Sequence, residues 1–224
     1  MRASQFGGNV ANGMIDIDAF DTHYRHVLIE QRKSGELHAC FRFKQFDERH
    51  NLDQSYSAQF YDLQRLEAYD LPMLEIGRFC IKKGVLDQCL LRVAWAFLTR
   101  YVDAHNIAFL FGCTSFVGTD QAKYTDAFAL LKERYLAPDH WKPQLKSSEV
   151  IEFADQLKNY KPVLKAANQN MPPLLRTYLS MGGRVSDHAV VDKQLDTLHV
   201  FTGLDIAAIP ATRARLLRAD AQEF

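Results

Sequence analysis

The octapeptide LEIGRFCI, residues 74–81, places a carboxylate and a guanidinium three positions apart in an otherwise apolar strand. Burying either charge is costly, so Glu75 and Arg78 indicate a site. Because side chains alternate between the faces of a strand, regular spacing would put these two on opposite faces. They reach one cavity only if the strand slips by a residue, and Gly77 is the residue that tolerates such a bulge. The competing interpretation is an edge strand whose two charges are solvated.

The residues that follow predict a parallel crossover connection. Residues 87–104 carry apolar side chains on two helical faces, with only a narrow polar stripe between them, which is typical of a helix covered on two sides. Residues 107–116 are almost continuously apolar, as in a strand buried on both faces. A strand, a helix and a strand in this order predict a right-handed parallel connection, and hence an α/β fold with a mixed sheet.

Composition limits the class of protein. The chain has 224 residues, of which 47% are hydrophobic and 24% charged, and we expect one domain spanning residues 1–224. Lys plus Arg and Asp plus Glu each count 27, so electrostatics gives no argument for nucleic acid as a partner. The four cysteines show no metal-ligand spacing, and we expect reduced core thiols and no metal. Without an apolar run of about 18 residues or a signal peptide, we expect a cytoplasmic protein.

A hairpin is predicted before residue 47. Residues 26–31 and 37–46 read as two antiparallel strands, joined by a turn that contains Gly35. Arg42 lies among apolar neighbours in the second strand, where an unpaired guanidinium would be costly, so we expect it to meet a carboxylate. Glu75 is the natural candidate if the two strands are neighbours.

The rest of the chain predicts shorter elements. We expect helices over residues 61–69, over 121–135, from the Pro172-Pro173 pair to Gly182-Gly183, and after Pro210, with a last strand over 197–205. Residues 138–171, rich in Lys and Pro, predict an insertion-like excursion with one weak helix. Asp16, Asp18 and Asp21 cluster before the hairpin, either as solvated turn carboxylates or as the wall of a polar substrate site.

Several common catalytic motifs are absent. The chain contains no GxGxxG, GxxxxGK[ST], GxSxG or HExxH, which argues against dinucleotide, P-loop, hydrolase-elbow and zincin chemistry.

Five phrases carry a family resemblance: LEIGRFCI, LFGCTSF.GTD, RYLAP, PPLLRTYL..GG and VVDKQLDTLHVF. In this order they resemble the N-acyltransferases that make lyso-ornithine lipid from 3-hydroxyacyl-carrier protein and ornithine. These belong to the GNAT-like superfamily and are sometimes labelled hemolysin-like. The resemblance implies a GNAT-like fold, in which splayed central strands are flanked by helices. It also implies no bound cofactor, since the phosphopantetheine arm of acyl-carrier protein is the donor, and peripheral membrane contact through the lipid product.

A more distant similarity is to acyl-homoserine-lactone synthases. Their Arg-x-x-x-Phe, Asp-x-x-Asp, strand arginine and Glu-x-x-Arg-Phe motifs look like Arg2 and Phe6, Asp18 and Asp21, Arg42, and Glu75, Arg78 and Phe79. The resemblance implies that Glu75 accepts the proton of the amine, while Arg78 and Arg42 bind or orient carboxylates. The other substrate-binding residues it implies are Arg2, Phe6, Asp18, Asp21, Phe79, and Ser115 and Phe116 of the phrase LFGCTSF.

The chain departs from the family pattern in two places. It begins at the Arg-x-x-x-Phe motif, so we expect an edge strand and part of a helix to be missing or the start to be misassigned. Lys82-Lys83-Gly84-Val85-Leu86 also occupies the place of the pyrophosphate loop of coenzyme A-dependent enzymes. This favours a carrier-protein donor, docked by Lys82, Lys83 and Arg92.

Three functions stay open at this point. The first is N-acylation of ornithine, and the second is acylation of another amine from acyl-carrier protein, as in a signal synthase. The region after residue 138 and the lipid-type phrases weigh against a signal synthase. The third is a non-catalytic acyl-binding protein.

Overall fold

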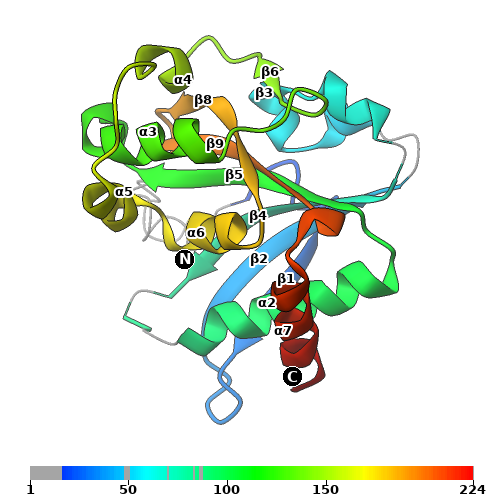
Figure 1. Cartoon of the computed structure of the whole chain (residues 1–224). Helices are drawn as coiled ribbons and strands as arrows, with labels where there is room; N and C mark the ends of the chain where they lie inside the picture. The colour runs from blue at the N-terminus through cyan, green and yellow to red at the C-terminus, as the bar shows by residue number, and fades with distance from the viewer. Residues whose placement is uncertain (1–16, 48–50, 70, 83, 86–87, 224) are drawn as a thin grey trace.

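A seven-stranded mixed sheet forms the centre of the molecule (Figure 1). The computed structural model describes residues 17–47, 51–69, 71–82, 84–85 and 88–223. The strand order is β1 (Arg25–Glu30), β2 (Leu37–Phe46), β4 (Met73–Ile81), β5 (Phe109–Val117), β9 (Thr197–Asp205), β8 (Arg184–Asp192) and β7 (Val150–Ile151). Among these seven described strands only β4 and β5 pair in parallel, and they are joined by helix α2 (Gln88–Ala104), which confirms the predicted crossover. The antiparallel pair of β1 and β2 confirms the predicted hairpin.

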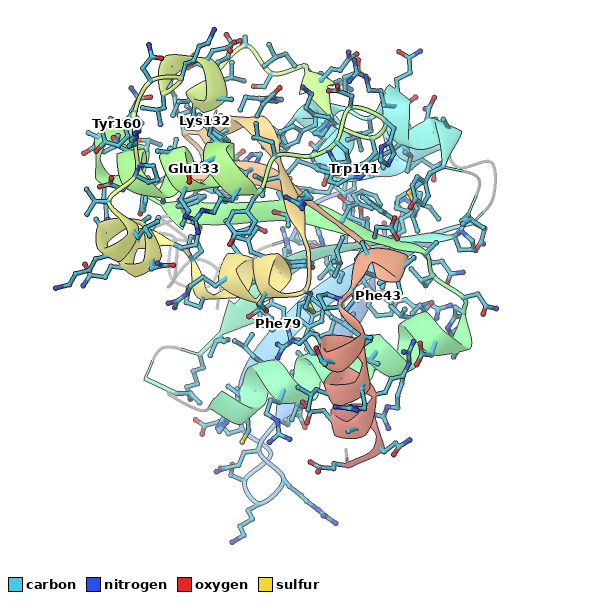
Figure 2. The ribbon with its side chains drawn as sticks, in the orientation of Figure 1. Phe43, Phe79, Lys132, Glu133, Trp141 and Tyr160 are labelled. Carbon is cyan, nitrogen blue, oxygen red and sulfur yellow. The ribbon has the colours of Figure 1, made fainter. Side chains whose placement is uncertain are left out.

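The helices that the structure describes pack on one face of the sheet. Helix α2 and helix α7 (Ala211–Glu223) contact each other and cover the half made by β1, β2 and β4. The β5, β9 and β8 half is covered by α3 (Thr125–Arg134), α4 (Phe153–Gln156), α5 (Leu164–Asn170) and α6 (Pro173–Ser180). Phe43 and Phe79 lie on this helical face, whereas Trp141 packs against Phe109 and Phe201 on the other (Figure 2).

The opposite face is covered by short elements. These are the 3-10 turns η1 (Leu52–Gln54), η2 (Ser57–Gln59) and η3 (Gln64–Ala68), with a small sheet of β3 (Tyr61–Asp62) and β6 (Gln144–Leu145). The helix predicted over residues 61–69 is therefore wrong, because its apolar residues pack onto the sheet from a strand and a 3-10 turn. The turn η4 (Gln121–Tyr124) precedes α3, and η5 (Ile206–Ala208) follows β9.

The segment 138–171 is more integrated than expected. It holds two short helices rather than one, and β7 pairs with β8 at the edge of the main sheet. Phe153 is fully buried and stacks on Phe128 of α3 at 5.0 Å between ring centroids. Lys132, also on α3, donates hydrogen bonds to the carbonyls of Leu157, Lys158 and Tyr160 (Figure 2). Packing thus fixes a segment whose local pattern is weak.

Strands β4 and β5 separate after a short ladder. Their parallel register has only the pairs Met73–Phe109, Leu74–Leu110 and Glu75–Phe111. At the point of separation a Cβ atom on Gly112 would lie well inside van der Waals contact of the Ile76 carbonyl oxygen, so the close approach requires glycine there. The splayed central strands expected from the family resemblance are confirmed.

The cysteines only partly follow the prediction of core thiols. Cys80 is buried, and Cys40 and Cys113 are partly buried. Cys89 is exposed at the start of α2, so the prediction is wrong for that residue.

Candidate active site

A cavity of about 550 Å³ fills the space where β4 and β5 part. Residues Ile76 to Phe79 line one side and Gly112 to Val117 the other, while residues of α6 and the β8–β9 hairpin close its ends. The lining includes Tyr178, which packs on the helical face of the sheet, and Tyr56, which packs against Phe60 on the opposite face, so the cavity passes through the sheet.

A bulge in β4 shapes one wall of the cavity. Between the pairs Cys40–Cys80 and Arg42–Gly77, strand β4 has one residue more than β2. Arg78 lies there with a φ of 51°, in the left-handed region that non-glycine residues rarely adopt. The predicted bulge is confirmed, next to Gly77 rather than at it. It turns Arg78 to the face that also carries Glu75.

Arg78 joins Arg42 and two aspartates in an ion-pair network. Arg42 Nη1 lies 2.7 Å from Asp18 Oδ1 and 2.6 Å from Asp21 Oδ1. Arg78 Nη2 and Nη1 lie 2.9 Å and 3.0 Å from the other oxygens of Asp18 and Asp21, respectively. The Arg42 side chain is 1% exposed, and its guanidinium carbon lies 4.9 Å from the Tyr24 ring centroid. The aspartates are thus network members rather than solvated turn residues.

Charge pairing controls the ionisation of this network. Burial by itself raises the pKa of Asp18, but the hydrogen bond and charge of Arg42, with the charge of Arg78, hold it below its ordinary value. The pKa of Asp21 is lowered by the hydrogen bond from the Asp18 backbone and by both arginines, against the opposing effect of burial. Both carboxylates are therefore ionised at neutral pH and balance the two guanidinium charges.

Glu75 has a different environment from the one expected. Its carboxylate accepts hydrogen bonds from the Tyr24 hydroxyl, the Tyr56 N–H at 3.0 Å, and the Ser57 N–H and hydroxyl at 2.7 and 2.6 Å. It is 1% exposed and is not among the residues that line the cavity. The prediction that Glu75 pairs with Arg42 is wrong, because Asp18 and Asp21 take that guanidinium. The role of Glu75 as proton acceptor stays a prediction.

The facing wall contains residues that the sequence reasoning missed. Thr197 and His199 of β9 and Asp192 of β8 line the cavity beside Ser115 and Phe116, which had been predicted as substrate-binding. The only sequence signal for these polar residues was their place in the phrase VVDKQLDTLHVF. The strand β8 itself was not predicted, since Ser186, Asp187 and His188 interrupt its apolar pattern.

The remaining predicted residues fall into two groups. Phe79 lines the cavity and stacks on Phe41, with ring centroids 5.4 Å apart. Lys82 pairs with Glu36, and Arg92 pairs with Asp220 and Glu223 of α7. Both predicted docking cations therefore already form ion pairs within the chain. Arg2, Phe6, Asp16 and Lys83 lie outside the described residues. None of the helices in the described ranges is long and apolar enough to cross a bilayer.

The mixed sheet, parted between β4 and β5 around a lined cavity, has the architecture of the GNAT acyltransferase fold. The acetyltransferase (GNAT) domain family matches residues 3–96. The L-ornithine N(alpha)-acyltransferase of Rhodobacter capsulatus is 32% identical over 201 residues, covering 87% of this chain and 76% of the relative. The Brucella abortus enzyme of the same name is 28% identical over 216 residues, covering 93% and 76%. The chain therefore belongs to the L-ornithine N(alpha)-acyltransferase family.

The solved structures that resemble this chain have lower sequence identity to it than these relatives. FeeM, an N-acyl amino acid synthase from uncultured soil microbes, has 10% identity and a TM-score of 0.46, covering 92% of this chain and 90% of that one. MesI, a CoA-dependent acyl-homoserine lactone synthase, has 12% identity and a TM-score of 0.44, covering 95% and 77%.

Proposed function

We propose that this protein transfers a 3-hydroxyacyl group from the phosphopantetheine arm of acyl-carrier protein to the α-amine of ornithine, as in lyso-ornithine lipid synthesis. The acceptor is supported by the names of the relatives from Rhodobacter capsulatus and Brucella abortus. The structural observation that carries the proposal is the through-sheet cavity between β4 and β5. It offers separate approaches for a thioester arm and for an amino acid.

The reaction joins the amine nitrogen to the thioester carbon and breaks the carbon–sulfur bond. The amine gives up one proton and the leaving thiolate gains one, so the products are an amide and a thiol. The β4 backbone beside the bulge has left its β5 neighbour, and its N–H groups can polarise the thioester oxygen. Apolar walls from Ile76, Phe116 and Leu174 exclude water that would hydrolyse the thioester.

The arginine–aspartate network is the proposed floor of the acceptor site. Its four charges cancel, so it can bind a zwitterionic amino acid by exchanging partners without burying a net charge. Arg42 and Arg78 both line the cavity and would face the acceptor carboxylate. Glu75 would act on this site through Tyr56, which it holds by the backbone N–H and which also lines the cavity.

The choice of donor is tested by direct competition. Because residues 82–86 lack the pyrophosphate-loop pattern, we expect acyl-carrier protein to be used at least about tenfold better in kcat/KM than the matching acyl-coenzyme A, which corresponds to about 1.4 kcal/mol in transition-state binding. The assay incubates the purified chain with each 3-hydroxyacyl donor and a panel of amino acids, and detects N-acyl products by mass. Equal use of both donors would contradict the carrier assignment, and no amide product from any donor would contradict the proposed function.

A further inference from the structure

Polar atoms without partners gather at the end of the cavity formed by the β8–β9 hairpin. Thr197 is 1% exposed and His199 is 3% exposed, yet Thr197 Oγ1 and His199 Nε2 have no hydrogen-bond partner among the described residues. Buried polar groups are normally paired, and leaving one unsatisfied is unfavourable. Both residues line the cavity, as does Asp192. A ligand in the cavity is therefore the natural source of the missing partners.

The surroundings of His199 determine that its Nε2 is an acceptor. The Tyr61 hydroxyl lies 2.8 Å from the His199 carbonyl oxygen and 3.1 Å from its Nδ1. A carbonyl oxygen can only accept, so the single hydroxyl proton goes there, and Nδ1–H donates to the tyrosine oxygen. Burial lowers the pKa of His199 to about 4, which keeps the ring neutral at neutral pH. Nε2 then carries a lone pair and no proton.

The three side chains are close together. Asp192 and Thr197 are directly opposite in the antiparallel ladder, and Thr197 and His199 are two residues apart on the same face of β9, which spans about 7 Å. One Asp192 oxygen accepts the Leu195 N–H at 2.9 Å, which fixes the carboxylate at the turn. The end of the cavity thus offers a carboxylate, a hydroxyl oxygen and an imidazole nitrogen, all able to accept, with one negative charge.

We propose that Asp192, Thr197 and His199 form a subsite for a primary alkylammonium group, the side-chain ammonium of a diamino acid acceptor. An alkylammonium has three N–H donors and one positive charge, which matches three acceptors and one carboxylate. A water molecule has only two donors and no charge. The subsite deepens the proposed function and rests on it, because it explains selection of ornithine over amino acids with uncharged side chains.

The test compares ornithine with L-2-aminopentanoate, which has the same carbon chain without the terminal amine. The full chain should acylate ornithine with a kcat/KM at least about tenfold higher, the usual scale of a charge-assisted hydrogen bond. Asp192→Asn should remove most of this preference by raising KM for ornithine, and leave 2-aminopentanoate kinetics within about twofold. Asp196→Asn is the matched control, because Asp196 lies in the same turn, is exposed and does not line the cavity.

Thr197→Val gives a readout that a structural role would not produce. Valine keeps the shape and removes the unsatisfied hydroxyl, so the melting temperature should stay the same or rise. Ornithine use should nevertheless fall several-fold while 2-aminopentanoate use is kept. A variant that loses stability and uses both acceptors less well in equal proportion would contradict the subsite.

Failure of the subsite and failure of the proposed function give different results. If the wild-type chain acylates both amino acids equally well, the subsite is refuted and N-acyl transfer stands. If it acylates neither, the proposed function fails, and calorimetric titration with ornithine then decides the subsite. Binding weakened by Asp192→Asn but not by Asp196→Asn supports it, whereas no binding or equal binding overturns it.

Discussion

Replacing Glu75 by Gln separates a structural role of this residue from a catalytic one. All four groups that contact the carboxylate are donors, and two of them are the backbone N–H groups of Tyr56 and Ser57. A glutamine amide offers one acceptor oxygen and one NH2 donor. Hydroxyls can rotate to accept from the NH2 group, but a backbone N–H cannot. Whichever way the amide turns, one buried N–H therefore faces another donor. The less costly orientation points the NH2 group at Tyr56, because its N–H also lies 2.9 Å from the Tyr24 hydroxyl oxygen and keeps that acceptor.

The expected loss follows from that count. The Tyr56 N–H loses the carboxylate and keeps the Tyr24 oxygen, which costs about 1 kcal/mol, the net value of one hydrogen bond, and loss of the charge from the remaining hydrogen bonds costs about 1 kcal/mol more. The total is about 2 kcal/mol. For a chain of this size each kcal/mol lowers the melting temperature by about 2–4 °C, so the expected decrease is about 4–8 °C.

The assay measures calorimetric melting and turnover on the same preparation, with turnover divided by the folded fraction. We expect turnover per folded molecule to stay within about tenfold of wild type. Loss of general-base catalysis would instead lower it by about 10²–10⁴. Near-normal melting with such a loss of turnover would refute the structural reasoning and support Glu75 as the base. Tyr24→Phe is the matched control: it removes one donor without creating a donor–donor contact, and should cost only about 1 kcal/mol.

Two further predictions concern residues that line the cavity. Gly112→Ala should destabilise the fold by about 1–3 kcal/mol and lower turnover, because its Cβ would clash with the Ile76 carbonyl oxygen where the strands part. Gly77→Ala is the control for stability, because its Cβ would meet nothing within 4 Å. Equal melting temperatures of the two variants would contradict the role of Gly112. Burial lowers the pKa of His199 from 6.5 to about 4. At a pH between these two values the His199 ring is therefore protonated in the unfolded chain and neutral in the folded chain. Its contribution to stability, roughly 3 kcal/mol, should therefore be present above pH 6.5 and be lost as the pH falls toward 4. Denaturant unfolding should give a lower free energy of unfolding at pH 5 than at pH 7 for the wild type, and a smaller difference for His199→Gln. An equal difference in the two proteins would contradict the prediction.

Elements with a local signal in the amino-acid sequence could be predicted before the structure was known. Alternating apolar residues and the turn at Gly35 predicted the β1–β2 hairpin, and the two-faced apolar pattern of α2 predicted the crossover to β5. The bulge was also a local inference, because two charges three residues apart in a buried strand can share a face only through an extra residue. These features depend on the periodicity of side chains along a single segment, which can be recognised without knowing what that segment packs against.

Which side chains contact one another could be seen only in the folded chain. Arg42 was expected to pair with Glu75 because both lie in neighbouring strands, but the chain before β1 brings Asp18 and Asp21 to the arginine. Glu75 is satisfied instead by residues 56 and 57. The strand β8 and the grouping of Asp192, Thr197 and His199 beside one cavity were missed for the same reason. Partner choice depends on register and on contacts between residues far apart in the chain, and no local period encodes it.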